Sequence, residues 1–512
     1  MKAKKLAVYI KNSSKSFYVA APYGKLLKGL FSDAGITLSM PCAGTGRCGK
    51  CKVTFIKGAP EPNSLDQAFL TDDEIVAGVR LACRCVLDKD CIISAEGLTF
   101  DETSMEVQSV ETADMSDRAF DKYGIAIDLG TTTIAAALIG SDSDNDEPQI
   151  IKTASTVNHQ RAYGSDVISR IAAAEARGCA DKLKELVTAD IESLIDEVSD
   201  PIGKRPELIC LAGNTTMLYL LCGDDTKELG QYPYKASHLS FRTEELRDIK
   251  TIILPGISAF VGADIVSGIY SLDLLSGKDE TALLIDFGTN GEIVYYDGDK
   301  LLTTSTAAGP VFEGGGISSG VPSVKGAIDH VTIHNGRAEV TTIGDETPMG
   351  LCGTGVIETM SELLRNDYVD ETGLLTLDYF EKGYPVYADE KIFFTQQDIR
   401  NVQLAKAAIY TGIKALTKEN IPSKVYISGG FGSHIDTDKI SNINMFPKEF
   451  NGNMLPMGNT SLKGAIRFLS EVFVGKEKEA TEAVEKIIEK AETVVLAADN
   501  SFNSEYLEAM NF

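Results

Sequence analysis

The feature that most constrains this chain is a hairpin pattern, Asp-x-Gly-Thr between two apolar runs, that occurs twice. The first copy begins at Asp128, with apolar residues at 123–127 before it and at 134–139 after it. The second copy begins at Asp286, 158 positions later, and is again flanked by apolar runs. Each copy predicts a strand, a tight turn and a second strand. Two such hairpins in one chain predict two related lobes that face a shared nucleotide.

The turn of each hairpin has the chemistry of a phosphate site. Its glycine lets the backbone approach a phosphate closely, and successive backbone N–H groups in such a turn form a concave anion site. A bound cation would lie beside the carboxylate that opens the turn. The residues that we expect around the phosphates are Gly130, Thr131, Thr132, Gly288, Thr289 and Asn290.

Composition excludes several classes of protein. The chain has 512 residues, 43% hydrophobic and 24% charged, which predicts a soluble globular protein of two to four domains. No stretch reaches the ~18 consecutive apolar residues of a membrane-spanning helix, and the first residues lack an apolar signal segment. We therefore expect a cytoplasmic protein without a membrane partner. The net charge of −25 argues against nucleic acid as a partner.

Six of the ten cysteines lie in the first 97 residues. Cys42, Cys48 and Cys51 have the spacing C-x5-C-x2-C, and Cys83 and Cys85 follow in an Arg-Leu-Ala-Cys-Arg-Cys segment. Without an export signal, metal ligation is favoured over disulfides. Four thiolates are the ligand set of a [2Fe–2S] cluster, and the small residues between the first two cysteines would let the loop wrap around it. Two alternatives are a structural zinc site, which usually pairs two C-x2-C motifs, and a P-loop, which requires Ser or Thr where Cys51 stands.

Residues 1–97 resemble the ferredoxins of the adrenodoxin type, which have this C-x5-C-x2-C spacing. The resemblance implies an α+β, β-grasp domain and a [2Fe–2S] cluster. In that family the fourth ligand lies in an Arg-Leu-x-Cys segment, which implies Cys83, with Cys85 as the alternative and Cys91 as a core residue of a strand. Residues 98–122 carry seven acidic and two basic residues and predict a solvated linker. The domain boundaries that we predict are 1–97, 98–122, 123–280 and 281–512.

Three polar residues outside the hairpins are candidates for the same site. Asn214 follows the buried strand 208–211 at a helix start, where it could position the attacked phosphate or its water; the alternative is an ordinary helix N-cap. Asp264 stands in an apolar segment and is either a cap or a site residue. Glu313 is a candidate general base for water, or an acid at the start of a helix.

Two glycine-rich segments complete the pattern. Residues 350–355 (Gly-Leu-Cys-Gly-Thr-Gly) precede a predicted helix, which is an anion-binding arrangement. Residues 425–434 form a predicted strand that runs into a glycine-rich turn. The order of the hairpins, the Gly-Asn-Thr turn at 213–215 and this strand-Gly-Gly-x-Gly segment resembles the ASKHA superfamily of acetate and sugar kinases, heat-shock chaperones and actin.

The ASKHA resemblance covers roughly residues 123–475 and implies two ribonuclease-H-like α/β lobes that close on ATP. It places Asp128 and Asp286 beside Mg²⁺, and the two hairpin turns around the β- and γ-phosphates. It places the adenosine beside the glycines of the last turn, Gly429, Gly430 and Gly432.

A ferredoxin fused ahead of an ASKHA ATPase resembles the reductive activators of corrinoid-dependent enzymes, the RACE family. This resemblance implies ATP-dependent reduction of a Co(II) corrinoid to Co(I). The partners it implies are the corrinoid protein of a methyltransferase system and a low-potential donor such as a ferredoxin, a flavodoxin or a reductase. The oligomeric state stays open, with a homodimer as one alternative. Members of the family often carry a further domain where this chain has only the linker.

Three rival interpretations remain at this point. The first is an activator of another anaerobic enzyme, although such activators usually hold a [4Fe–4S] cluster between subunits. The second is a small-molecule kinase with a ferredoxin appendage, which would transfer phosphate to a carboxylate or a sugar. The third is a nucleotide-binding scaffold of the actin type, with little turnover and no redox chemistry.

Overall fold

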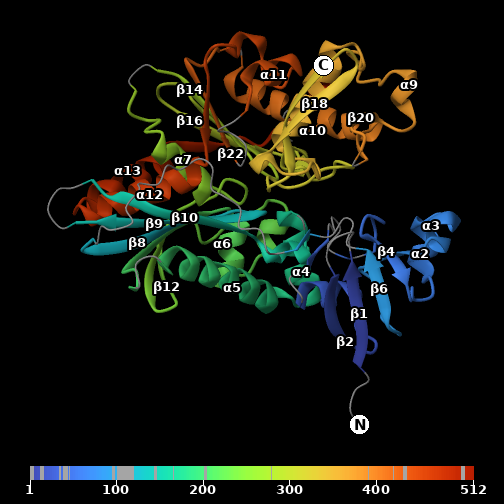
Figure 1. The fold of residues 1–512 in the computed structure, drawn as a ribbon. Helices are drawn as coiled ribbons and strands as arrows, with labels where there is room; N and C mark the ends of the chain where they lie inside the picture. Colours follow the sequence, from blue (N-terminus) through green and yellow to red (C-terminus); the bar gives the residue numbers. More distant parts are fainter. Residues whose placement is uncertain are drawn as a thin grey trace. The chain divides into compact units, whose positions relative to one another are not determined.

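A computed structural model gives the fold of the chain (Figure 1). The residues that it describes are 5–11, 16–33, 36–38, 44, 46–94, 99–100, 120–142, 147–164, 166–200, 204–277, 280–389, 391–418, 420–429, 435–496 and 502–512. Cys42, Gly430, Gly432 and nearly all of the predicted linker lie outside this part of the chain. The chain divides into two compact units: the first holds residues 1–104, 157–190 and 219–234, and the second holds 105–156, 191–218 and 235–512.

The first unit contains a five-stranded sheet in the order β2-β1-β6-β4-β5. Strands β1 and β2 pair antiparallel as a hairpin, and β6 pairs parallel with β1 on its other side. Leu6, Val8 and Ile10 alternate along β1 and are buried, as expected for a strand with one face on a core. The elements are β1 (Lys5–Lys11), β2 (Ser16–Pro22), α1 (Leu27–Asp33), β3 (Ile36–Thr37), β4 (Lys52–Lys57), α2 (Ser64–Phe69), α3 (Asp72–Val76), β5 (Val79–Leu81), β6 (Cys91–Ser94) and β7 (Thr99–Phe100).

The rest of the first unit is largely helical. Asp166 caps α4 (Val167–Arg177) by accepting a hydrogen bond from the Ser169 N–H. The side chain of Arg170 is fully buried and donates to the Gly164 carbonyl and to Gln160. The neighbouring elements are η1 (His159–Ala162), α5 (Ala180–Ser199), α6 (Thr215–Cys222) and η3 (Lys227–Gly230), of which α5 and α6 continue into or begin in the second unit.

The second unit contains two six-stranded sheets. The first has the order β10-β9-β8-β11-β13-β12 and carries the first Asp-x-Gly-Thr hairpin on β8 and β9. Strand β11 pairs parallel with both β8 and β13 and is buried along its whole length, which is typical of a central parallel strand. The elements are β8 (Lys122–Leu129), β9 (Thr133–Ser141), β10 (Gln149–Val157), β11 (Leu208–Gly213), β12 (Arg242–Leu246), β13 (Ile249–Ile253) and α7 (Ala263–Ser271).

The second sheet has the order β23-β22-β14-β15-β16-β24 and carries the second hairpin on β14 and β15. Its central strands repeat the first sheet, because β22 pairs parallel with β14 as β11 does with β8, and β23 lies beyond β22 as β13 lies beyond β11. Helix α12 therefore follows β23 as α7 follows β13. The elements are β14 (Ala282–Phe287), β15 (Gly291–Tyr296), β16 (Leu301–Thr306), β22 (Lys424–Gly429), β23 (Met454–Gly458), α12 (Thr460–Phe473), α13 (Glu477–Lys490) and β24 (Ala491–Thr493).

Among the remaining elements of the second unit, α10 packs on β15 and β16 of this sheet, and α8 packs on β17. Helix α8 carries the Gly-Thr-Gly segment at its start, with Cys352 as its N-cap residue. Among the described residues no helix is long and apolar enough to span a membrane. The elements are η4 (Pro310–Glu313), β17 (Ala327–His334), β18 (Arg337–Thr342), η5 (Ile343–Asp345), β19 (Gly350–Leu351), α8 (Gly353–Arg365), α9 (Leu377–Phe380), β20 (Tyr384–Tyr387), β21 (Ile392–Phe394), α10 (Gln396–Thr417), α11 (Thr437–Asn442), η6 (Lys448–Phe450) and α14 (Phe502–Glu508).

Candidate functional site

The turns of the two hairpins meet at Glu313. Thr132 lies two positions after Gly130 of the first hairpin, and Thr289 directly follows Gly288 of the second hairpin. Their hydroxyl oxygens lie 3.3 Å apart, and both donate to Glu313 Oε2, at 3.1 Å from Thr132 and 2.9 Å from Thr289. The structure therefore brings three predicted site residues together from η4 and from the two hairpins.

The glycines close both turns with backbone hydrogen bonds. The Gly130 N–H donates to the Thr133 carbonyl at 3.1 Å, and the Gly288 N–H donates to the Asn290 carbonyl at 3.0 Å. A Cβ atom at Gly130 would lie 2.6 Å from the Thr133 carbonyl oxygen, so the first turn excludes a side chain there. Both turns are as tight as the sequence predicts.

Asp128 stands near the end of β8, and both of its carboxylate oxygens are held from α12. Ser461 Oγ donates to Oδ1 at 2.7 Å, and Asn459 Nδ2 donates to Oδ2 at 2.8 Å. Burial raises the pKa of the Asp128 carboxyl above its usual range, and the hydrogen bonds from Ser461 and Asn459 oppose that rise. Both partners are neutral, so they orient the carboxylate without cancelling its charge.

Asp286 occupies the equivalent position on β14 and has a different set of partners. Ser428 Oγ, at the end of the neighbouring strand β22, donates to Asp286 Oδ2 at 2.8 Å. Burial raises the pKa of Asp286 to about 6, the Ser428 hydrogen bond opposes the rise, and the negative charges of Asp128 and Glu313 add to it. The two hairpin carboxylates are therefore close enough to repel one another.

Two further carboxyl groups belong to this cluster. Asp264, the second residue of α7, has a pKa raised to about 8 by burial and then by repulsion from Asp286 and Asp128. Burial and the charges of Asp264 and Asp286 also raise the pKa of Glu292, on β15, well above its usual range. The N-cap residue of α7 is Gly262 and not Asp264. This favours Asp264 as a residue of the site over Asp264 as a helix cap. Among the described residues no three His, Cys, Asp or Glu side chains lie close enough to hold a metal ion by themselves. A divalent cation at these carboxylates would therefore also need oxygen ligands from the nucleotide phosphates and water.

Asn214 lies beside the first hairpin and caps a helix. Its backbone N–H donates to the Leu129 carbonyl at 3.3 Å, and its side-chain oxygen accepts from the Thr216 N–H at 3.0 Å. The side-chain oxygen of Asn214 therefore acts as a helix cap, as the alternative interpretation expects. The backbone hydrogen bond to Leu129 places the residue beside the first hairpin. Gly429, at the end of β22, has φ +111°, and a Cβ there would lie 2.1 Å from the Phe287 carbonyl oxygen.

In the first unit, strand pairing brings two of the predicted cluster ligands together. Strands β4 and β5 are antiparallel with Lys52 opposite Leu81, and the Ala82 N–H donates to the Cys51 carbonyl at 2.8 Å. Cys83 follows directly, so Cys51 and Cys83 stand at the same end of this strand pair. Both are almost fully buried, and Cys48 is partly exposed.

The loop before Cys51 has the backbone that a cluster requires. Gly44, Gly46 and Gly49 have φ values of +67°, +80° and +64°, which favour glycine. A Cβ at Gly44 would lie 3.2 Å from Cys83 Cβ, and one at Gly46 would lie 2.5 Å from a Leu65 methyl carbon. The described cysteines and glycines therefore fit a [2Fe–2S] cluster, which also needs a fourth thiolate.

Cys85 and Cys91 have the environment of core residues. Both are buried in the hydrophobic core of the five-stranded sheet, and Cys91 is the first residue of β6. Burial raises the pKa of the Cys85 thiol to about 12, with added repulsion from Asp66 and Cys91, and raises that of Cys91 to about 11. Cys51 and Cys83 are buried in the same core, so burial does not separate the two candidates. Cys83 is the one whose Cβ lies beside the loop at Gly44, and this position favours it over Cys85 as the ligand.

The residues that donate hydrogen bonds to Asp128 were not predicted from the sequence. Asn459 and Ser461 belong to a Gly-Asn-Thr-Ser run at 458–461, which nearly repeats the Gly-Asn-Thr-Thr run at 213–216. The repeat was a usable signal, because the first copy already pointed to the site. Glu292 was missed because it reads as an ordinary residue of the second hairpin's outgoing strand.

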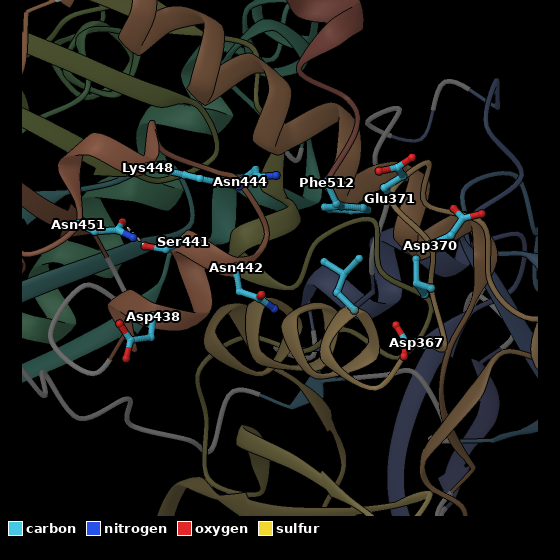
Figure 2. Close-up of a pocket in the computed structure, with 12 residues that line it drawn as sticks. Asp367, Asp370, Glu371, Asp438, Ser441, Asn442, Asn444, Lys448, Asn451 and Phe512 are labelled. Carbon is cyan, nitrogen blue, oxygen red and sulfur yellow. Dashed lines mark hydrogen bonds between the residues drawn. The ribbon is translucent and has the colours of Figure 1, made fainter.

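A separate hollow of about 650 Å³ lies elsewhere in the second unit, between α8, α11 and the last residues of the chain (Figure 2). Asp367, Asp370, Glu371 and Asp438 give its wall an acidic character, and Lys448 is the basic residue among those that line it. Figure 2 shows the ring of Phe512 on the same side as Glu371. None of the predicted site residues lines this hollow.

Comparison with known proteins matches nearly the whole chain. Residues 9–88 match the family described as "2Fe-2S iron-sulfur cluster binding domain", residues 123–276 match "RACo middle region", and residues 280–512 match "C-terminal domain of RACo the ASKHA domain". The fold class predicted from the sequence, a ferredoxin domain followed by an ASKHA region, is thereby confirmed.

Two relatives span most of this chain. The corrinoid activation enzyme RamQ of Eubacterium limosum is 28% identical over 87% of this chain and 90% of its own length. The [Co(II) methylated amine-specific corrinoid protein] reductase of Methanosarcina barkeri is 25% identical over 76% of this chain and 77% of its own length. A solved structure described as "Reductive activator for corrinoid,iron-sulfur protein" matches with a TM-score of 0.68 and 26% identity, over 99% of this chain and 98% of that one.

These matches define the class of protein, which is an iron–sulfur ferredoxin domain joined to an ASKHA-type ATPase. Within that class, the middle and C-terminal matches are both to regions of one activator family. The chain belongs to the reductive activators of corrinoid-dependent enzymes, the RACE family.

Proposed function

We propose that this protein is an ATP-dependent reductive activator that returns the inactive Co(II) corrinoid of a methyltransferase system to Co(I). The observation that carries the proposal is that one chain holds both required parts, a [2Fe–2S]-type cysteine framework and a carboxylate-lined pair of phosphate turns. Relatives named for corrinoid activation and for reduction of a Co(II) corrinoid protein support it across both parts.

Asp128 and Asp286 are the carboxylates that would hold Mg²⁺. The turns Gly130–Thr132 and Gly288–Asn290 would present backbone N–H groups and hydroxyls to the β- and γ-phosphates, and Gly429, Gly430 and Gly432 would lie beside the adenosine. Mg²⁺, when bound, supplies positive charge against the charge that develops on the transferred phosphoryl group.

Glu313 is our candidate for the base that accepts a proton from the attacking water. Its carboxylate already accepts hydrogen bonds from Thr132 and Thr289, so it stands where the two phosphate turns meet. Asn214 would orient the water or the attacked phosphate from the edge of the first hairpin.

In the first unit, Cys42, Cys48, Cys51 and Cys83 would hold the cluster. The [2Fe–2S] cluster, when bound, supplies one-electron transfer. We propose a low-potential ferredoxin, flavodoxin or reductase as its electron donor.

ATP is required because the reduction is uphill. Each tenfold in the equilibrium of a one-electron transfer corresponds to about 59 mV, so a modest change in the cobalt environment shifts the reaction substantially. A nucleotide can drive such a change only if it binds two states of the protein with different affinity. Closure of the ATPase on ATP, which would remodel the complex with the corrinoid protein, meets this condition.

The test is to incubate the anaerobically purified protein with a reductant and a Co(II) corrinoid protein, and to follow the cobalt absorption with and without ATP. We expect Co(I) to appear only with ATP. Equal formation of Co(I) without ATP would make the protein an electron carrier with a regulatory ATPase. ATP hydrolysis without Co(I) for any corrinoid protein tested would contradict the proposal.

A further inference from the structure

The start of α12 reaches both hairpin carboxylates, Asp128 directly and Asp286 through Ser428. Asn459 is its N-cap residue, whose side-chain oxygen accepts from the Leu462 N–H at 2.8 Å while its amide group donates to Asp128. Ser461, two residues on, donates to the other oxygen of Asp128. Asn459 therefore uses its two side-chain heteroatoms for two purposes, one in the helix and one in the site.

Thr460, between them, acts on the second carboxylate through Ser428. Thr460 and Ser428 are fully buried, and their hydroxyl oxygens lie 2.6 Å apart. Because Ser428 donates its single hydroxyl proton to Asp286, the Thr460 hydroxyl must be the donor to Ser428. A chain of hydrogen bonds thus runs from Thr460 through Ser428 to Asp286.

The start of α12 is fixed against α7 in turn. Ser267 Oγ donates to the Ser461 carbonyl at 2.7 Å. A Cβ at Gly464 would lie 2.0 Å from the Ser267 carbonyl oxygen, and one at Gly268 would lie 2.8 Å from Thr460 Oγ1. The two helices lie side by side (Figure 1), and their glycines allow a contact too close for Asn459, Thr460 and Ser461 to shift independently of α7.

The corresponding position on α7 shows why the partners of Asp128 are neutral. Asp264 is the second residue of α7, as Ser461 is the second residue of α12. On α7 the residue is a buried carboxyl group near Asp286, whereas on α12 it is a hydroxyl that donates to Asp128. A lysine at 461 would also hold Asp128, but it would cancel the charge that a divalent cation needs. A neutral donor orients the carboxylate and leaves its charge in place.

We propose that Asn459, Thr460 and Ser461 are positioning residues of the ATPase, which fix the orientation and separation of Asp128 and Asp286 for the Mg²⁺–nucleotide complex. The proposal rests on the ATPase part of the proposed function. Mg²⁺ requires near-ideal octahedral geometry, so a carboxylate that is free to rotate binds it less well. Loss of these donors is therefore expected to act first on the Mg²⁺ dependence.

The test measures ATP hydrolysis by the full-length protein, without a corrinoid protein, over a range of Mg²⁺ concentrations. Ser461→Ala removes one donor to Asp128. Asn459→Ser removes the other but keeps a good helix N-cap, because Ser and Asn cap about equally well. For each variant we expect kcat to fall roughly tenfold and the half-saturating Mg²⁺ concentration to rise severalfold, in line with the loss of a hydrogen bond to a charged group, with KM for ATP at saturating Mg²⁺ nearly unchanged.

Ser470→Ala is the matched control, because it removes a hydroxyl from the same helix nine positions beyond Ser461. It is expected to leave kcat and the Mg²⁺ dependence at wild-type values. Wild-type Mg²⁺ dependence in both Ser461→Ala and Asn459→Ser would overturn the positioning role, and so would an equal loss in Ser470→Ala. A wild-type protein that hydrolyses no ATP, with or without a corrinoid protein, would instead overturn the ATPase part of the proposed function, on which this proposal rests.

Discussion

Thr132 of the first hairpin and Thr289 of the second approach each other to 3.3 Å between hydroxyl oxygens, although 157 positions separate them in the chain. Both hydroxyls donate to the same oxygen of Glu313. The two phosphate turns are therefore joined through one carboxylate, which either serves as the base for water or only holds the turns together.

Glu313→Gln separates these two roles. The amide oxygen of glutamine can accept from both threonine hydroxyls, but glutamine cannot take a proton from water. If Glu313 is the base, kcat for ATP hydrolysis should fall by about 10²–10⁴-fold while KM and the unfolding temperature stay near wild type. Steady-state kinetics and thermal unfolding check this. Wild-type kcat in Glu313→Gln would leave Glu313 a purely structural role.

Asp286→Ala is expected to abolish ATP turnover and leave the iron–sulfur spectrum intact. The carboxylate faces Asp128, Asp264 and Glu313 in the carboxylate cluster, whereas the cysteine framework belongs to the first unit. The measurements are ATP hydrolysis and visible absorption of the anaerobic protein. Asp299→Ala is the control, because its side chain is 91% exposed in the turn between β15 and β16 and its loss should leave turnover unchanged. Normal ATP turnover in Asp286→Ala would contradict the assignment of Asp286 to the ATP site.

Cys83→Ala and Cys85→Ala form a matched pair for the cluster. Cys83 follows the end of the strand pair that holds Cys51, and its Cβ lies beside the loop at Gly44. Cys85 is two residues further on, and burial raises the pKa of its thiol to about 12. We expect Cys83→Ala to lose the visible absorption of the [2Fe–2S] cluster and Cys85→Ala to keep it. Anaerobic reconstitution followed by absorption spectroscopy decides between them, and the reverse result would exchange the two assignments.

The sequence predicted the parts of the site that are local and missed those that depend on packing between distant elements. Both hairpins were predictable, because a strand, a glycine turn and a second strand form within about 15 residues. The hydrogen bond from Ser461 to Asp128 could not be predicted, because 333 positions separate the two residues. No local pattern specifies which helix reaches a given carboxylate.

The electrostatics of the site also had to come from the fold. Asp264 reads as either a cap or a site residue in the sequence, and its raised pKa arises from burial and from Asp286 and Asp128. Those charges become neighbours only once α7 and both hairpins are assembled. The choice between Cys83 and Cys85 shows the same limit, since their spacing in the sequence is similar and only their surroundings differ.

Asp264→Asn tests the carboxylate cluster through the pH dependence of stability. The folded-state pKa of Asp264 is about 8, above the ordinary value of about 3.9 for aspartate, so the folded protein binds more protons than the unfolded chain between these values. By linkage, this group's contribution to stability is full at low pH and is lost as pH rises toward 8. At 1.36 kcal/mol per pKa unit, the loss is at most roughly 6 kcal/mol. Asparagine does not titrate, so Asp264→Asn removes this pH-dependent loss of stability.

The expected result is that, in Mg²⁺-free buffer with chelator, Asp264→Asn unfolds at a higher temperature than wild type at pH 8, and that this difference shrinks as pH falls toward 5. Thermal unfolding monitored from pH 5 to 8.5 checks it. Asp273→Asn, an exposed site just beyond the same helix, should show no pH-dependent difference. Added Mg²⁺ should stabilise the wild type more than Asp264→Asn at pH 8, because the cation replaces the proton in neutralising the cluster. A stability difference that does not change with pH would show that folding does not raise the pKa of Asp264.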